Sequence, residues 1–226
     1  IHLSGEYAID PSDFVDSLVE LLTGLGVELL PDHRVESFEH HGGRLTAVVT
    51  DHGRLATEQV VLAAGHGIRH IGKLLGLRIP VVAGQGYNMV LPENAGLPKP
   101  VISEEVHAVA TPMPGRIRLG GTMEFGGDAP AFDGRRLDAI ERSFRRFLDL
   151  DWDQRSTPWA GLRPMSPDGL PLIGRPKGWT NLVLAGGHGM YGLTLAPATA
   201  DVVAQLVIDG RCDTDLTAFD PNRFRL

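Results

Sequence analysis

A glycine-rich turn between an apolar strand and a helix is the first place where this sequence could perform chemistry. The run LVLA leads into GGHGMYG, residues 186–192, and we expect a helix to begin near Leu193. Glycine lets another group approach the backbone closely, and the amides at a helix N-terminus favour negative charge or an acceptor oxygen. Four glycines in seven residues favour a ligand here. An ordinary tight turn is the alternative.

Arg163, in the segment WAGLRPMSPDGLPLIG, is the second candidate. A guanidinium is a fixed two-pronged donor that matches a carboxylate, and its burial without such a partner is unfavourable. Two partners for Arg163 are compatible with the sequence. One is the carboxylate of a ligand, and the other is nearby Asp168, with which it would form a salt bridge.

Three further polar side chains are weaker candidates. His188 lies between glycines, where packing or hydrogen bonding is a commoner role than catalysis. Tyr87 either offers its hydroxyl to a substrate or packs, and Glu124 faces either a pocket or solvent. The histidines and the single cysteine show no metal-ligand spacing, and no serine has the G-x-S-x-G context, so we expect neither a metal site nor a serine hydrolase.

Composition narrows the class of protein. The 226 residues are 42% hydrophobic and 22% charged, typical of a folded chain with one large core or two smaller ones. A net charge of −7 argues against a nucleic-acid partner. One cysteine, Cys212, allows no internal disulfide and fits a reducing compartment. No apolar run is long enough to span a membrane and no signal peptide is recognisable, so we expect a cytoplasmic protein, with peripheral membrane association as the alternative.

The periodicity of apolar residues predicts the elements around these candidates. A helix begins at Pro11 behind the cap Asp10 and ends near Gly26, and a short buried strand follows over residues 27–30. Residues 34–65 read as an antiparallel meander. Its last strand, residues 60–64, is continuously apolar, as in a parallel sheet covered on both faces. Residues 80–125 read as antiparallel strands, and a helix at 134–150 turns Leu137, Ile140, Phe144, Phe147 and Leu148 to one side.

Three segments, in this order, carry a resemblance to a known family. They are VVLAAGHGIRHIGKLLGLRIPVVAGQGYNMVL, RIRLGGTMEF and WAGLRPMSPDGLPLIGRPKGWTNLVLAGGHGMYGLTLAPATADVVAQLV. Together they resemble the FAD-dependent D-amino acid oxidase and dehydrogenase superfamily, which includes glycine and sarcosine oxidases, and GLRPMSPDGLPLIG is most similar to the bacterial D-amino acid dehydrogenases. The family's N-terminal G-x-G-x-x-G unit has no counterpart here. We therefore expect the C-terminal portion of such an enzyme, completed by a missing N-terminal segment or partner.

The resemblance implies a fold of class α/β plus α+β. A partial Rossmann-type FAD-binding domain is expected over residues 1–78 and 159–226. It is interleaved with an antiparallel-sheet, substrate-binding domain over residues 79–158.

The resemblance also implies a role for individual residues. Arg163 is the expected catalytic and substrate-binding residue, since the family's arginine in GLRP pairs with the substrate carboxylate. Tyr87 and Tyr191 are expected to contact the substrate. The expected FAD contacts are Val35, Ala64, Gly65, Gly187, His188, Gly189, Met190, Gly192, Leu193 and Thr194.

The implied reaction oxidises the CH–NH bond of a small D-amino acid to an imino acid and then a keto acid, with hydride passing from Cα to flavin N5. The electron acceptor is oxygen or a quinone. Two alternatives stay open: a sarcosine-, glycine- or proline-type amine oxidase or dehydrogenase, and a non-catalytic fragment or subunit that needs an N-terminal partner.

Overall fold

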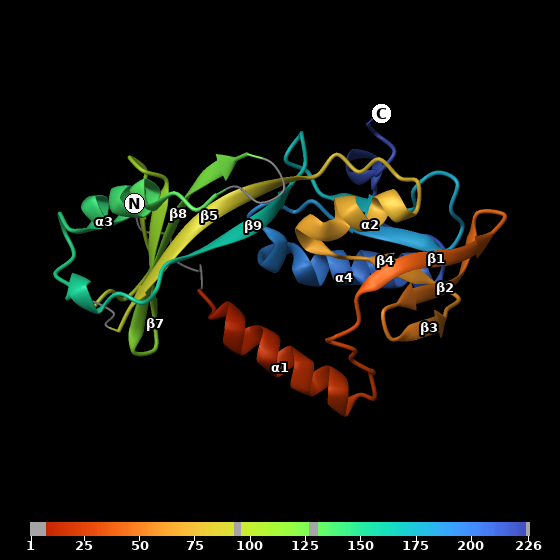
Figure 1. Ribbon diagram of the computed structural model, residues 1–226, viewed down its shortest axis with the longest axis horizontal. Helices are drawn as coiled ribbons and strands as arrows, with labels where there is room; N and C mark the ends of the chain where they lie inside the picture. The colour runs from red at the N-terminus through yellow and green to blue at the C-terminus, as the bar shows by residue number, and fades with distance from the viewer. Residues whose placement is uncertain (1–7, 93–95, 127–130, 225–226) are drawn as a thin grey trace. The chain divides into compact units, whose positions relative to one another are not determined.

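The computed structural model describes residues 8–92, 96–126 and 131–224 (Figure 1). The chain divides into two compact units. Unit 1 comprises residues 1–29 and 85–162, and unit 2 comprises residues 30–84 and 163–226. The expected cofactor and substrate roles of the ranges 1–78, 79–158 and 159–226 are not tested by this division and stay predictions. The mixed class of helices with antiparallel and parallel strands is the one expected from the sequence.

Unit 2 opens with the predicted meander. Its strands are β1 (Val35–His41), β2 (Arg44–Thr50) and β3 (Gly53–Ala56), hydrogen-bonded in the order β1-β2-β3. Both pairings are antiparallel. Two left-handed glycines, Gly42 and Gly43, form the first turn, which only glycine adopts without strain.

A second sheet in unit 2 carries the parallel pairing. Its order is β10-β11-β4, with β10 at Leu172–Gly174, β11 at Leu182–Gly186 and β4 at Val60–Leu62. Strand β11 runs antiparallel to β10 and parallel to β4. The prediction of a parallel strand within residues 60–64 is therefore confirmed.

Helices cover the two faces of this sheet (Figure 1). Because side chains alternate along a strand, Val183 faces α4 (Gly192–Ile208), where Val202 and Leu206 pack against it. Leu182 and Leu184 face the opposite side, in a cluster with Ile68 of α2 (Ile68–Leu74). The short 3-10 helix η1 (Gly65–Gly67) connects β4 to α2, and η3 (Thr217–Phe219) lies in the C-terminal segment.

Asn181 joins the meander to this sheet. Its side chain is fully buried; the carbonyl accepts a hydrogen bond from Leu45 N at 2.8 Å, and the amide donates to Leu45 O and Glu58 O at 2.8 and 2.7 Å. Its backbone carbonyl accepts from Val60 N at 2.9 Å. Asn181 therefore fixes where β11 begins, relative to β2 through its side chain and relative to β4 through its backbone carbonyl.

Unit 1 is built on a five-stranded sheet in the order β6-β7-β8-β5-β9. The strands are β5 (Val82–Leu91), β6 (Val101–Ser103), β7 (Ala108–Met113), β8 (Arg116–Phe125) and β9 (Trp159–Met165). The first residues of β5 and the last of β9, from Arg163 on, belong to unit 2. Strands β6, β7 and β8 pair antiparallel as predicted. The short 3-10 helix η2 (Trp152–Gln154) precedes β9.

Helix α3 (Gly134–Phe144) packs on this sheet through Leu137, Ile140 and Phe144. The helix is shorter than predicted. Phe147, expected on the same apolar side, lies beyond its end and is 53% exposed. The helical periodicity no longer determines the direction of a side chain once the helix has ended.

The first helix, α1 (Pro11–Gly24), starts where the sequence predicts. Asp10 Oδ1 accepts a hydrogen bond from Ser12 N at 3.0 Å, and the Asp10 carboxylate also pairs with Arg116. The predicted buried strand at residues 27–30 is wrong: this segment is irregular, and Val27 and Leu29 are exposed. An apolar run forms a strand only where another strand offers its hydrogen-bonding groups, and no described strand pairs with this segment.

Replacing Asn181 with alanine is expected to lower the free energy of unfolding by about 2–4 kcal/mol, because the buried backbone N–H and carbonyl of Leu45 lose their partners and the Glu58 carbonyl loses a donor. Urea denaturation measures this loss. Gln205→Ala is the control. It removes two solvent-exposed hydrogen bonds, with Asp201 Oδ2 and with Asp213 N, and should change stability by less than about 0.5 kcal/mol. An Asn181→Ala protein as stable as the control would show that Asn181 does not hold the two sheets together.

Candidate functional site

Two turns of unit 2 lie at the same edge of the parallel sheet. Leu62 of β4 is paired with Leu184 of β11, so the two strands run to the same edge of the sheet, where β4 leads to Ala64–Gly65 and β11 to Gly186–Gly187. A Cβ at Gly186 would lie 2.6 Å from Ile68 Cδ1, which shows how closely the start of α2 approaches β11. Ligands of open α/β sheets bind outside the carboxyl ends of parallel strands. This edge is therefore the candidate site.

Backbone conformation and close packing explain why glycines occupy the second turn. Gly187 and Gly189 have φ angles of +76° and +58°, in the left-handed region. A Cβ at Gly187 would lie 2.7 Å from Leu172 Cδ1. Close packing thus requires glycine here with or without a ligand. Gly65, with φ +53°, differs, because a Cβ there would meet nothing within 4 Å.

The N-terminus of α4 presents free donors next to apolar side chains. The helix begins at Gly192, and the preceding Tyr191 provides no side-chain cap. The first amides of a helix lack intrahelical acceptors, so here they are available to an acceptor atom. Tyr191 is 60% exposed, and Met190, Leu193 and Thr194 are exposed as well. Donors flanked by apolar surface fit an aromatic ring that has acceptor atoms along one edge.

Arg163 lies on β9, the strand whose end is hydrogen-bonded to the glycine turn. Gly189 N donates to Pro164 O at 2.8 Å, and Met165 forms an antiparallel bridge with His188. Arg163, half-buried on β9, is the residue before Pro164. The structure therefore brings Arg163 and the glycine turn, which are far apart in the sequence, into adjoining backbone segments.

Asp168 does not serve as the salt-bridge partner suggested for Arg163. Its carboxylate receives two hydrogen bonds from Arg223, Nε to Oδ2 at 2.8 Å and Nη2 to Oδ1 at 2.9 Å. Hydrogen bonding from Arg223 lowers the pKa of Asp168 to about 2. This pair fastens the C-terminal segment to the loop after β9.

His188 is held inside the turn. Its Nε2 lies 3.0 Å from Thr199 Oγ1 on α4, and its backbone carbonyl accepts from Tyr191 N at 3.0 Å. Burial lowers the pKa of the imidazole below its ordinary value. A neutral His188 therefore connects the glycine turn to the helix that follows it.

Tyr87 lies in unit 1 and is fully buried. Its hydroxyl donates to Glu124 Oε2 at 2.5 Å and accepts from Gln85 Nε2 at 2.9 Å. Glu124 also pairs with Arg136, with 3.2 Å between Oε2 and Nε. The hydroxyl of Tyr87 thus has protein partners, and its expected substrate contact stays a prediction.

Ser166 is a residue that the sequence analysis missed. Its side chain is buried, and within the described part of the chain its Oγ has no hydrogen-bond partner. Its Cβ would lie 3.6 Å from a Cβ placed on Gly187. Buried hydroxyls normally find partners, so an unsatisfied one beside the turn fits a polar ligand. Val35, the remaining expected contact, begins β1.

The described residues contain no cluster of histidine, cysteine, aspartate or glutamate that could hold a metal ion. In the same described ranges, no helix is long and apolar enough to cross a membrane.

A family model for FAD dependent oxidoreductases matches residues 1–206. The chain belongs to this family. It is 33% identical over 97% of its length to a D-amino acid dehydrogenase of Neisseria gonorrhoeae and 34% identical over 93% to one of Bradyrhizobium diazoefficiens. It covers 53% and 51% of these proteins, so the chain spans about half the length of the curated relatives it matches.

Solved structures show the same fold. The L-proline dehydrogenase from P. horikoshii superposes with a TM-score of 0.84 at 23% identity, over 95% of this chain and 60% of the other. The glycine oxidase from Geobacillus kaustophilus superposes with a TM-score of 0.82 at 26% identity, over 94% and 58%. Three features of this edge fit the flavin ring of the family's cofactor. They are the uncapped start of α4, the open space at Gly65 and the Ser166 hydroxyl, which has no partner among the described residues.

The lowered pKa of His188 predicts a dependence of stability on pH. The unfolded chain binds the proton more readily, so the contribution of neutral His188 is complete above the ordinary pKa of 6.5 and decreases as the pH falls below it. Urea denaturation between pH 7.5 and about pH 5 should show a shallower loss of stability for His188→Gln than for the wild type. His70→Gln, at an exposed position of the same unit, is the matched control. Identical slopes for wild type and His188→Gln would contradict a buried neutral imidazole.

Asp168→Asn should reduce the free energy of unfolding at neutral pH by about 1 kcal/mol, since solvent screens a carboxylate side chain that is 35% exposed. The folded pKa lies below the unfolded one, so this contribution is present above the ordinary value of 3.8 and is lost as the pH falls toward about 2. Denaturation at pH values across this window, with Asp16→Asn at an exposed position of α1 as control, measures the effect. If the variant loses stability in acid as steeply as the wild type, Arg223 does not stabilise the charged form of Asp168.

Proposed function

We propose that this chain forms the substrate-facing and flavin-facing portion of an oxidoreductase that oxidises the CH–NH bond of a small D-amino acid. The observation that carries the proposal is the attachment of β9 to the glycine turn through Gly189 N and Pro164 O, beside Arg163. The names of the curated relatives support D-amino acids as the substrate class.

FAD, when bound, supplies an acceptor for the hydride that leaves the Cα of the substrate. The amides at the start of α4 would donate hydrogen bonds to an acceptor edge of the ring and stabilise negative charge there. Ala64, Gly65, Gly187, Gly189 and Met190 would lie along the same edge, with the Ser166 hydroxyl as a further donor. His188 would keep this turn in place through Thr199.

Arg163 would bind the substrate carboxylate through two parallel hydrogen bonds. Such a clamp fixes both the position and the orientation of the amino acid, and orientation is what this chain contributes to the reaction rate. A side-chain base is unnecessary where the amine binds in its neutral form, so none is assigned. Tyr191, exposed beside the turn, is the other residue proposed to meet the substrate.

Uncovered apolar surface in unit 2 favours an active form that includes more polypeptide than this chain. Ile208 of α4 is 79% exposed, and Leu193, Leu195 and Val61 are exposed too. Among the described strands, β4 is the last of its sheet and pairs on one side only. An N-terminal segment or partner subunit would cover these surfaces, in which case the chain alone is a subunit that lacks activity by itself.

The chemistry is shared by glycine, sarcosine and proline oxidising enzymes, and the solved neighbours include an L-proline dehydrogenase and a glycine oxidase. These amines are the alternative substrates. The electron acceptor is oxygen or a quinone.

Arg163→Leu in the FAD-loaded protein should leave the flavin content unchanged and decrease kcat/KM for a D-amino acid by an amount equivalent to about 2–5 kcal/mol, because the carboxylate loses its ion-paired donor. Anaerobic bleaching of the flavin absorbance measures this rate.

Arg163→Lys retains the charge without the planar fork and should fall between wild type and Arg163→Leu. Arg211→Leu, at an exposed position of unit 2, is the control for loss of a cation. Wild-type kcat/KM in Arg163→Leu would rule out the carboxylate clamp. Oxidation of amines without a carboxylate at the same rate as D-amino acids would do so as well.

A further inference from the structure

The hydroxyl of Thr199 on α4 makes a contact outside its own helix. Serine and threonine hydroxyls within helices commonly donate to the carbonyl three or four residues earlier. In α1, Ser17 and Thr23 donate in this way to carbonyl oxygens four residues earlier, at 2.7 and 2.8 Å. Thr199 forms no such bond within the described residues. Its Oγ1 lies instead 3.0 Å from Nε2 of His188, which is eleven positions earlier in the glycine turn.

The side chain of His188 lies along one face of α4. Gly192, the first residue of the helix, and Thr199 are two turns apart, so they share this face. A Cβ placed on Gly192 would lie 3.7 Å from His188 Cβ. The imidazole therefore starts beside the first turn of the helix and reaches the Thr199 hydroxyl. Both ends of the residue are fixed, since the His188 backbone is bridged to Met165.

The hydrogen bond to Thr199 determines which ring nitrogen of His188 carries the proton. A hydroxyl can donate to a bare nitrogen or accept from an N–H group. Within the described part of the chain, Nε2 is the one atom to which Thr199 Oγ1 is hydrogen-bonded. If Oγ1 accepted from Nε2–H, the hydrogen of this partly buried hydroxyl would have no acceptor on the protein. Donation from Thr199 to Nε2 avoids this and leaves the proton of the neutral ring on Nδ1.

Nδ1 is the ring nitrogen nearer to the glycine turn, because it is bonded to Cγ. Among the described residues it has no hydrogen-bond partner and, unlike Ser166 Oγ, it is not buried. Burial of the ring lowers the pKa of His188, so the imidazole is neutral at neutral pH. Nδ1–H is therefore an accessible donor at the turn, close to the first amides of α4.

From this arrangement we infer that Thr199 is a positioning residue that holds His188 in its Nδ1–H form, and that this N–H group is a further donor to a ligand at the glycine turn. A carbonyl oxygen or a bare ring nitrogen is the kind of ligand atom that it would bind. The role toward the ligand rests on the proposed function, which assigns this turn to the edge of the flavin. The position of the proton does not.

The position of the proton is measured by 15N NMR of the histidine rings in the chain without FAD, at a pH above the ordinary pKa of 6.5. The wild type should show a protonated Nδ1 and a bare Nε2, the reverse of the tautomer that free histidine prefers. Thr199→Ser retains the hydroxyl and should show the same pattern. Thr199→Val retains the shape without the hydroxyl and should show both tautomers in exchange. A protonated Nε2 in the wild type, or an unchanged pattern in Thr199→Val, would overturn the inference.

The donor role toward the ligand is tested by titrating the same variants with FAD and following the amide NMR signals. Thr199→Val removes the group that holds the donor, so its dissociation constant for FAD should rise about two- to tenfold, the usual effect of one neutral hydrogen bond. Thr199→Ser should bind like the wild type. Thr214→Val, at an exposed position of the same unit, should do so as well. Equal affinity of Thr199→Val and the wild type would show that Nδ1–H does not meet the ligand.

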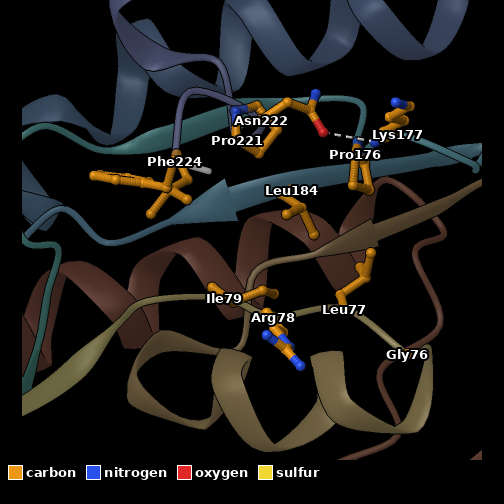
Figure 2. A pocket seen from close by; sticks show the side chains of 11 residues that line it. Gly76, Leu77, Arg78, Ile79, Pro176, Lys177, Leu184, Pro221, Asn222 and Phe224 are labelled. Carbon is orange, nitrogen blue, oxygen red and sulfur yellow. Dashed lines mark hydrogen bonds between the residues drawn. The ribbon is translucent and has the colours of Figure 1, made fainter. Parts of the chain in front are cut away.

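A hollow of about 390 Å³ elsewhere in unit 2 provides an internal reference for the titration. Figure 2 shows the loop of residues 76–79 on one side of it and Pro221, Asn222 and Phe224 on the other. None of its described lining residues belongs to the glycine turn. FAD should shift the amides of residues 187–194 and leave those of the hollow unchanged. Shifts confined to the hollow, or none at residues 187–194, would overturn the proposed function together with the donor role, whereas the tautomer measured without FAD decides the role of Thr199 by itself.

Discussion

The parallel pairing of β4 with β11 is the constraint on which the candidate site depends. Because Leu62 lies opposite Leu184, the two strands end at one edge, and the backbone of both turns is placed there without any direct bond between them. The carboxyl ends of parallel strands are where such folds bind ligands. A slip in this register would separate the Ala64–Gly65 turn from the glycine turn after β11.

A few specific hydrogen bonds hold the strands and turns of the candidate site in this register. The Asn181 side chain holds the start of β11 against Leu45 of β2 and against Glu58, which precedes β4. The bond from Gly189 N to Pro164 O then attaches the end of β9, and with it Arg163, to the turn. His188 and Thr199 extend the attachment to α4. The position of the Arg163 backbone beside the turn thus follows from backbone pairing.

Features set by residues close together in the sequence could be predicted, whereas contacts between residues far apart in the sequence could not. The cap Asp10 with Pro11, the glycine hairpin of the meander and the apolar strand near residue 60 are signals within a few residues, and the structure has all three. The pairing of Asp168 with Arg223 joins residues 55 positions apart, so proximity in the sequence suggested Arg163 instead. The apolar stretch at residues 27–30 had strand composition, but no strand in the described part of the chain pairs with it. The buried, unsatisfied hydroxyl of Ser166 carries no sequence signal at all.

The most direct test of the account is an amide NMR map of the chain titrated with FAD up to millimolar concentration. The donors at the start of α4 and the open space at Gly65 both belong to this chain, so even weak binding should be visible there. The account predicts that the largest shifts fall on residues 64–67 and 187–194, the two turns at the end of the parallel pair. Shifts confined to other residues, or none at either turn, would contradict the assignment of this edge to the flavin.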